Sequence, residues 1–257
     1  MLEFIKSIAG QAGDIIKAGY QRQKNQVSHK GNIDLVTDID LKSEDFLVKA
    51  IKDKYPSHSI ITEEKDNLIT ESNHRWVIDP LDGTTNFSHH YPFCAVSIAL
   101  EIDNRVEYAV VYNPIFSELF WSQRGKGAFL NGKKINVSQT VKISNSLVAT
   151  GFPYDRWEKG DIYIKEFLAF MKRTQGVRRA GAAAIDLCYT AAGRLDGFFE
   201  RKLKPWDMAA GSLILAEAGG KISRYDGSDW HYNDDTIVAS NQKIHNKMID
   251  ILNLRFD

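Results

Sequence analysis

Residues 76–86 read WVIDPLDGTTN, and this stretch decides both the fold and the chemistry that the sequence predicts. Its three apolar residues predict a strand that ends in the carboxylate of Asp79. Pro80 disfavours helical geometry for Asp79, and a second carboxylate, Asp82, follows three residues after the first. The densest group of chemically active residue types in the chain therefore lies at the end of this strand.

The residues after Asp82 favour an anion site. Gly83 lets the backbone approach another group closely, and residues 84–86 (TTN) can open a helix. Backbone N–H groups at such a helix start suit an oxyanion, most obviously phosphate. The alternative interpretation is an Asx-type turn and a helix cap, because Asp-Pro and Asp-Gly are common turn pairs.

Two more acidic segments lie near the ends of predicted elements. Glu63–Glu64 follows a predicted short strand over residues 59–61, and taken alone it is typical of a solvated acidic pair. Asp207 precedes an apolar helix over residues 208–218 and is an ordinary N-cap candidate. A carboxylate at a helix start can equally be directed at a cation.

The remaining pattern alternates between helical and strand periods without an internal repeat. Spacings of three and four predict helices over residues 2–19, 41–54, 160–173, 182–192, 208–218 and 243–254. Spacings near two predict strands over 60–61, 76–78, 95–100, 106–111 and 119–121, with shorter ones at 195–199, 220–223 and 236–239. Asn131-Gly132 predicts a tight hairpin turn, and residues 28–33 predict a polar loop. This order favours an α+β fold of layered helices and sheets.

Composition is that of an ordinary soluble globular protein. The chain has 257 residues, enough for one or two domains, and its 33 basic residues balance 33 acidic ones. A zero net charge argues against a dominant nucleic-acid or membrane surface. Two buried free thiols, Cys94 and Cys188, are favoured over a single disulfide, and the expected location is the cytoplasm. The sequence has no P-loop and no GxSxG motif, and the adjacent pair His89–His90 lacks the spacing of a zinc site.

Five segments in order resemble the inositol monophosphatase family, within the magnesium-dependent, lithium-sensitive phosphatase superfamily. They are residues 34–40 (DLVTDID), 62–64 (TEE), 79–86 (DPLDGTTN), 127–132 (GAFLNG) and 206–211 with 217–220 (WDMAAG, EAGG). The resemblance covers nearly the whole chain. It implies a layered α/β/α/β/α sandwich of the sugar phosphatase type, one domain over residues 1–257 with lobes of about 1–145 and 146–257.

The resemblance also implies a set of metal ligands, which are Glu63, Asp79, the backbone carbonyl of Leu81, Asp82 and Asp207. Two or three Mg²⁺ ions would bind, one shared by Glu63 and Asp79, one held by the three aspartates, and a weaker one near Glu63. Hard oxygen ligands of this kind suit Mg²⁺. Without cations, the converging carboxylates would repel one another and a phosphate dianion alike.

Roles in catalysis follow from the same resemblance. Asp40 and Thr84 would orient the water that attacks phosphorus in line with the leaving alcohol, without a phosphoenzyme. Asp40 is also a helix-cap candidate before residues 41–54. The loop 30–32 (KGN) would correspond to a family loop that closes over the third ion. Catalytic residues would be Asp40, Glu63 and Thr84, and substrate-binding residues would be Asp82, Gly83, Thr84, Ala183 and Glu200.

The resemblance implies Mg²⁺-dependent hydrolysis of inositol 1-phosphate or a related small sugar phosphate. Fructose-1,6-bisphosphatase activity, alone or as a second specificity, is the alternative. Thr85 favours the inositol branch, because superfamily phosphatases acting on 3′-phosphoadenosine 5′-phosphate often carry lysine there. A regulatory protein bound to the transcription machinery is a further alternative, although the neutral charge gives it no support. A homodimer is expected by analogy.

Overall fold

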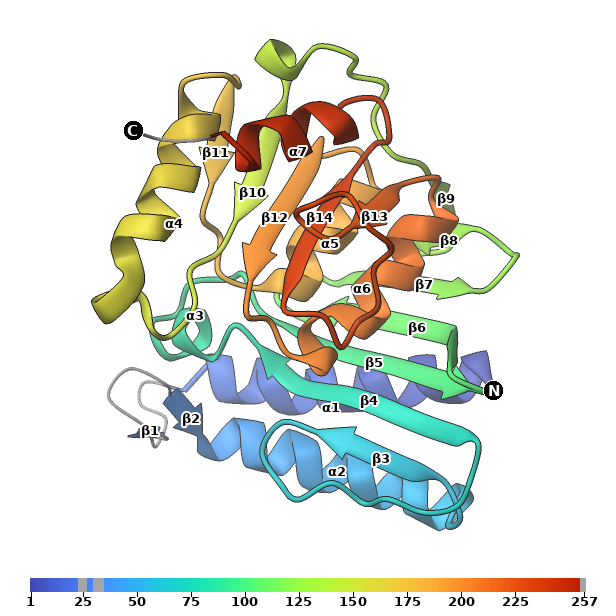
Figure 1. Cartoon of the computed structure of the whole chain (residues 1–257). Helices are drawn as coiled ribbons and strands as arrows, with labels where there is room; N and C mark the ends of the chain where they lie inside the picture. Colours follow the sequence, from blue (N-terminus) through green and yellow to red (C-terminus); the bar gives the residue numbers. More distant parts are fainter. Residues whose placement is uncertain (23–26, 30–34, 255–257) are drawn as a thin grey trace.

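The computed structural model of the chain describes residues 1–22, 27–29 and 35–254, and its helices and sheets form five layers (Figure 1). Helices α1 (Leu2–Tyr20) and α2 (Asp38–Lys54) cover one face of a large sheet. Helices α5 (Ala183–Ala191) and α6 (Pro205–Glu217) lie between this sheet and a smaller one. Helices α4 (Arg156–Met171) and α7 (His245–Leu252) cover the outer face of the smaller sheet. The predicted layered α/β/α/β/α sandwich is confirmed.

The large sheet has the strand order β3-β4-β5-β6-β7-β8-β9 within the described residues. Its strands are β3 (Ser59–Thr62), β4 (His74–Asp82), β5 (Ala95–Ile102), β6 (Arg105–Asn113), β7 (Glu118–Gln123), β8 (Ala128–Leu130) and β9 (Lys133–Ile135). Only β3 and β4 pair in parallel, so the two strands leave the sheet at the same end. The carboxyl ends of β3 and β4 therefore lie side by side.

The smaller sheet has the order β11-β10-β12-β14-β13. Its strands are β10 (Leu147–Thr150), β11 (Gly176–Arg178), β12 (Gly197–Arg201), β13 (Lys221–Ser223) and β14 (Thr236–Ser240). The remaining elements are the pair β1 (Val27–His29) and β2 (Leu35–Thr37), the short helix α3 (Thr84–Ser88) and the 3₁₀ turn η1 (Ile143–Asn145). The division into lobes near residue 145 stays a prediction.

Successive side chains of β4 point alternately into two different hydrophobic cores. Trp76 and Ile78 pack with α1 and α2, whereas Val77 packs with α5 and α6. A strand covered on both faces needs apolar residues at successive positions, because neighbouring side chains point to opposite faces. This double burial explains the unbroken apolar run before Asp79.

Several predicted boundaries are wrong for identifiable reasons. Helix α2 begins at Asp38 because the side chain of Thr37 caps it, and α6 begins at Pro205 rather than at residue 208. Strand β4 continues to Asp82, so Asp79 lies inside the strand and not at its end. Part of the predicted loop 28–33 is the end of β1, and residues 30–34 lie outside the described residues. The short strands β10 and β11 lacked a clear period and were not predicted.

Other predictions are confirmed. Asn131 and Gly132 join β8 to β9 with φ values of 48° and 78°, as a tight hairpin turn requires. Cys94 and Cys188 are buried free thiols. Across the described ranges, none of the helices combines the length and apolar character needed to span a bilayer.

Candidate active site

Asp79 and Asp82 face the same side of β4 because the strand contains a bulge. Asp79 pairs with Ser97 on β5, and Asp82 pairs with Ala95. Between these two pairs β4 advances by three residues and β5 by two. In a regular strand, side chains three positions apart would point to opposite faces. The hydroxyl of Ser97 donates to the carbonyl of Trp206 at 3.2 Å, which marks this face as the one covered by α6. The bulge therefore directs both carboxylates toward the helices between the sheets.

Glu63 reaches the same region through the parallel pairing of β3 with β4. Thr62, the last residue of β3, lies opposite Ile78. Glu63 therefore leaves the sheet beside Asp79, and it is half-buried. The predicted location of Glu63 at a strand end is confirmed.

Asp207 comes from the first turn of α6. Lys204 is the N-cap residue, Pro205 follows at the first helical position, and the N–H of Lys204 donates to Asp207 Oδ2 at 2.6 Å. The prediction that Asp207 itself is the N-cap is therefore wrong. Proline suits the first helical position because it has no N–H to satisfy, and this starts the helix earlier. The carboxylate still lies at the positive end of the helix dipole.

The four carboxylates of Glu63, Asp79, Asp82 and Asp207, here called the acidic cluster, influence one another's charge. Burial raises the pKa of Asp79 well above its usual range, and the charges of the other three members raise it further. Burial raises the pKa of Asp82 to about 8, and repulsion from Glu63 adds to that rise. The structure thus brings together four side chains from three segments of the sequence.

The acidic cluster has the donor chemistry of a site for hard divalent cations. Among the described residues, no lysine or arginine is a main influence on the pKa of Asp79 or Asp82. Carboxylate oxygens are the ligands that Mg²⁺ prefers. Asp79 Oδ1 accepts the N–H of Leu81 at 2.9 Å, and Asp82 Oδ2 accepts the N–H of Ala184 at 2.8 Å. These backbone bonds hold carboxylates in place that would otherwise separate.

The acidic cluster does not form a ready-made metal site in this structure. Within the part of the chain that the structure describes, no three His, Cys, Asp or Glu side chains already have the arrangement of a metal site. Like charges favour such an open arrangement until a cation offsets their repulsion.

Asp40 and Thr84 form a hydrogen-bonded pair, as the predicted joint role requires. The hydroxyl of Thr84 lies 2.8 Å from Asp40 Oδ1 and 3.1 Å from the carbonyl oxygen of Leu81. Burial raises the pKa of Asp40, although hydrogen bonds from Thr37 and Thr84 oppose the rise. Asp40 is not the cap of α2 but its third residue, and it forms a capping box with Thr37.

The predicted substrate-binding residues surround Asp82. Gly83 has φ of +89°, and a Cβ there would lie 2.8 Å from the carbonyl oxygen of Phe93, so a larger residue does not fit. Ala183 begins α5, whose second residue donates to Asp82. Glu200 lies on β12, and burial raises its pKa to about 8, with the charge of Arg179 opposing and that of Asp207 adding to the rise. The predicted loop 30–32 lies outside the described residues.

Two buried acids close to the predicted site residues received no role from the sequence. Glu44 on α2 is fully buried, and its Oε1 accepts hydrogen bonds from the segment that contains Glu63. Asp186 on α5 is buried beside Glu200, and its Oδ1 has no hydrogen-bond partner within the described residues. A signal for Glu44 was present, because it shares the spacing of Asp40, Leu47 and Ile51 on the buried face of α2.

Comparison with known proteins agrees with this fold. The pattern of the inositol monophosphatase family matches residues 1–253. The Nus factor SuhB of Escherichia coli K12 is 42% identical over 251 residues, which cover 97% of this chain and 94% of that protein. The inositol-1-monophosphatase of Synechocystis is 47% identical over 229 residues, covering 88% and 80%.

Solved structures show the same arrangement. The extragenic suppressor protein SuhB of Bartonella henselae has a TM-score of 0.95 at 39% identity, covering 99% of this chain and 98% of that one. An IMPase/NADP phosphatase complexed with Mg²⁺ and phosphate has a TM-score of 0.86 at 25% identity, covering 98% and 95%.

Fold and site together define a layered α+β protein with a buried acidic site at the carboxyl ends of two parallel strands. The match over residues 1–253 and the relatives above 40% identity make the family plain. The chain belongs to the inositol monophosphatase family.

Proposed function

We propose that this chain is a Mg²⁺-dependent phosphomonoesterase that hydrolyses inositol 1-phosphate or a related small sugar phosphate to the alcohol and phosphate. The observation that carries the proposal is the acidic cluster, whose members raise the pKa of Asp79 in a buried site. A family relative that binds Mg²⁺ and phosphate supports it. The donor chemistry supports it independently, because uncompensated carboxylates would otherwise repel the substrate.

Glu63, Asp79, Asp82 and Asp207 would hold two or three Mg²⁺ ions, with the carbonyl of Leu81 as a further ligand. When bound, Mg²⁺ would offset the charge of the cluster, activate a water and stabilise the leaving alkoxide.

The Asp40–Thr84 pair would orient the attacking water. The single proton of the Thr84 hydroxyl is donated to Asp40 or to the carbonyl of Leu81, so the hydroxyl's lone pairs are free to accept a hydrogen bond from water. Asp40 is anchored by the backbone N–H and hydroxyl of Thr37, which fixes the direction of the pair. Such fixed geometry lowers the entropic barrier to in-line attack.

The alcohol part of the substrate would lie against Ala183 and Glu200, with the phosphate near Gly83 and Thr84. Glu200 packs over Gly151, where a Cβ would lie 2.1 Å from its carboxylate oxygens. Carboxylate oxygens of Asp82 and Glu200 can accept hydrogen bonds from the hydroxyl groups of a polyol. This pattern of acceptors suits a sugar or an inositol ring.

A substrate panel tests the proposal directly. Phosphate release from inositol 1-phosphate, fructose 1,6-bisphosphate and 3′-phosphoadenosine 5′-phosphate would be measured with Mg²⁺ and after chelation. We expect Mg²⁺-dependent turnover, fastest with inositol 1-phosphate, and inhibition by lithium. Preference for fructose 1,6-bisphosphate would establish the alternative specificity, and full activity after thorough chelation would refute the proposal.

The names of the SuhB relatives favour one second candidate. The protein called Nus factor SuhB matches 97% of this chain, so we also propose a regulatory association with the transcription machinery. Purified chain would be mixed with RNA polymerase and followed by sedimentation. Co-sedimentation of wild type and of an inactive Asp82→Asn variant would support a regulatory role that does not need catalysis.

We further propose a homodimer in the cytoplasm. After its kink at Lys159, helix α4 leaves Ile164, Leu168 and Met171 exposed at spacings of four and three, which place them along one side of the helix. Sedimentation equilibrium distinguishes a mass of two chains from a mass of one.

A further inference from the structure

The segment that contains Glu63 is held to the body of the protein by one buried carboxylate. Glu44 Oε1 lies 2.5 Å from the hydroxyl of Thr62, 3.2 Å from the N–H of Glu64 and 3.1 Å from the N–H of Lys65. Both of these N–H groups follow Glu63 in the chain, whereas the Thr62 hydroxyl precedes it. Glu44 therefore holds a side chain just before this predicted ligand and two backbone N–H groups just after it.

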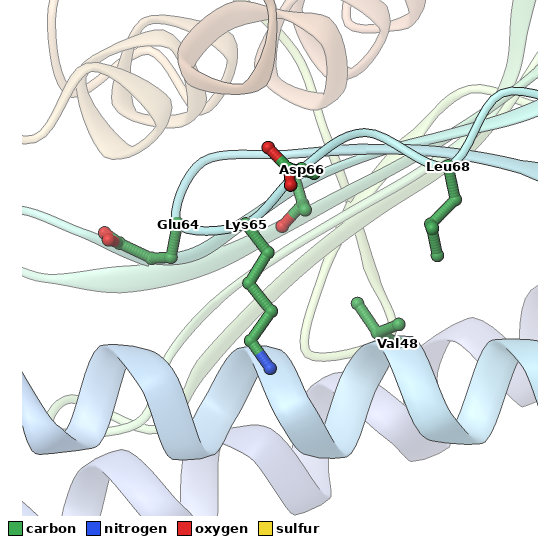
Figure 2. Close-up of a pocket in the computed structure, with 6 residues that line it drawn as sticks. Val48, Glu64, Lys65, Asp66 and Leu68 are labelled. Atoms are coloured by element: carbon green, nitrogen blue, oxygen red, sulfur yellow. The ribbon is translucent and has the colours of Figure 1, made fainter.

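A second contact of this segment with α2 is exposed to solvent. Figure 2 shows Lys65 and Asp66 above α2, with Leu68 and Val48 on opposite sides of the gap. A hollow of about 570 Å³ separates the segment from the helix, lined by Val48, Thr62, Glu64, Lys65, Asp66 and Leu68. An ion pair joins Lys65 to Asp45, whose side chain is 65% exposed. Exposed pairs of this kind contribute little to stability.

Glu44 also shares a face of α2 with residues that hold the rest of the site. Asp40 lies one turn earlier and binds Thr84, and Ser43 donates to the carbonyl of Pro80 in the β4 bulge at 2.9 Å. Positions i, i+3 and i+4 lie on one side of a helix. Helix α2 thus sets the distance from Glu63 to the Asp79–Asp82 bulge.

The burial of Glu44 favours more than a packing role. Its side chain is fully buried, and Oε2 has no hydrogen-bond partner among the described residues. An unsatisfied buried carboxylate oxygen is destabilising, and proteins retain such groups mainly at functional sites.

We propose that Glu44 is a positioning residue for Glu63, and that it controls how tightly the acidic cluster binds Mg²⁺. This inference rests on the proposed function. Glu44 does not touch substrate or metal; it acts through the Thr62 hydroxyl before Glu63 and the N–H groups of Glu64 and Lys65 after it.

The test compares Glu44→Ala and Glu44→Gln with Asp45→Ala as the matched control. Asp45 is the next residue on α2, and it also contacts the segment, but through an exposed pair. Mg²⁺ binding would be measured by calorimetry on the full chain, and amide hydrogen exchange would be measured at residues 62–66 and in β5. We expect Glu44→Ala to weaken Mg²⁺ binding about tenfold or more and to abolish protection at Glu64 and Lys65, while protection in β5 stays unchanged.

Glu44→Gln retains one acceptor oxygen but not the charge, so we expect intermediate protection and a loss of about threefold to fivefold in Mg²⁺ affinity, and Asp45→Ala should remain within twofold of wild type. If Glu44→Ala does not fold, the Glu44→Gln measurement decides alone: a change of threefold or more in Mg²⁺ affinity supports the inference, and no change overturns it. Unchanged protection at 64 and 65, or lost protection with unchanged affinity, also overturns it. Failure of the wild-type chain to bind Mg²⁺ would instead refute the proposed function.

Discussion

Glu101 and the acidic cluster both place buried carboxylates at the large sheet, but they differ in how the carboxylate charge is compensated. Glu101 on β5 is 2% exposed, and it is bound by Arg75 across the strand pair at 2.9 Å and by the hydroxyl of Tyr232. Burial, together with the bond to Glu101, raises the pKa of Tyr232 to about 12, so the phenol remains a donor. Asp79 and Asp82, the two members of the acidic cluster on β4, have no lysine or arginine among the main influences on their pKa values.

The difference separates a structural carboxylate from a functional one. A buried charge is tolerated when the chain supplies its partners, as it does for Glu101. Buried carboxylates without a cationic partner destabilise the fold, and such groups are retained where an external ion completes them. Removing a charge should therefore have opposite effects on stability in the two places.

The largest expected effect is on turnover in Asp82→Asn. The amide can still accept the N–H of Ala184, so the fold should persist. Loss of a ligand charge should lower kcat/KM for inositol 1-phosphate by about 10³-fold or more, in line with the barrier reduction that metal ions supply. Initial-rate kinetics at saturating Mg²⁺ measures this loss.

The stability of the same variant tests whether Asp82 differs from a structural carboxylate such as Glu101. Without divalent ions, Asp82→Asn removes repulsion from the acidic cluster, so its melting temperature should equal or exceed that of wild type. A clear decrease in melting temperature would show that Asp82 has a structural role like that of Glu101.

Mg²⁺ itself should stabilise the wild-type chain. A ligand that binds only the folded state at 100 times its dissociation constant adds about 2.7 kcal/mol to the free energy of unfolding. Thermal unfolding in a Mg²⁺ titration should show this increase, and chelation should reverse it. Calorimetry of Asp82→Asn under the same conditions serves as the control, and a similar stabilisation there would place the ion elsewhere.

The sequence was sufficient for the fold and for the order of the acidic segments, because both are local. The apolar run before Asp79 follows from its composition and spacing, whereas the parallel pairing of β3 with β4 was not predicted. The bulge that turns Asp79 and Asp82 to one face was not predictable, since it depends on pairing with β5, far along the chain. The helix starts at Asp38 and Pro205 were missed because capping by Thr37 and a proline at the first position extend the helices past their apolar residues.

Glu44 shows most clearly what could not be predicted from the sequence. Its spacing with Asp40 was visible, but a glutamate on a helix is usually a solvated residue. Only the packing of α2 against the segment after β3 reveals that its carboxylate accepts backbone N–H groups near Glu63. Contacts of this kind join residues 20 positions apart, and no local pattern encodes them.

A smaller effect, on stability, is expected at Glu101, whose charge is compensated by Arg75. Arg75→Ala would leave Glu101 buried with only Tyr232 as a partner. Because the arginine side chain is 35% exposed, we expect a loss of about 2 to 3 kcal/mol in the free energy of unfolding, at the low end for broken buried pairs. Urea denaturation measures it, with kcat per folded molecule expected to stay within twofold. A loss below about 0.5 kcal/mol would remove the distinction between the two groups.

The smallest effect concerns a buried titratable group that stays neutral, His245 at the start of α7. Its ring nitrogens lie 2.8 Å from Ser240 Oγ and 2.9 Å from Ser223 Oγ, and burial, with the charge of Lys221, lowers its pKa to about 4. The unfolded chain has a histidine pKa near 6.5, so between these values only the unfolded state takes up the proton. The stabilising contribution of neutral His245 is therefore complete above about pH 6.5, and it is lost as the pH falls toward 4.

We expect wild type to lose about 1 to 2 kcal/mol relative to His245→Gln between pH 7 and pH 5, measured by urea denaturation of both at each pH. The glutamine variant carries the same carboxylates, so their titration cancels, and a pH-independent difference between the two proteins would contradict the assignment.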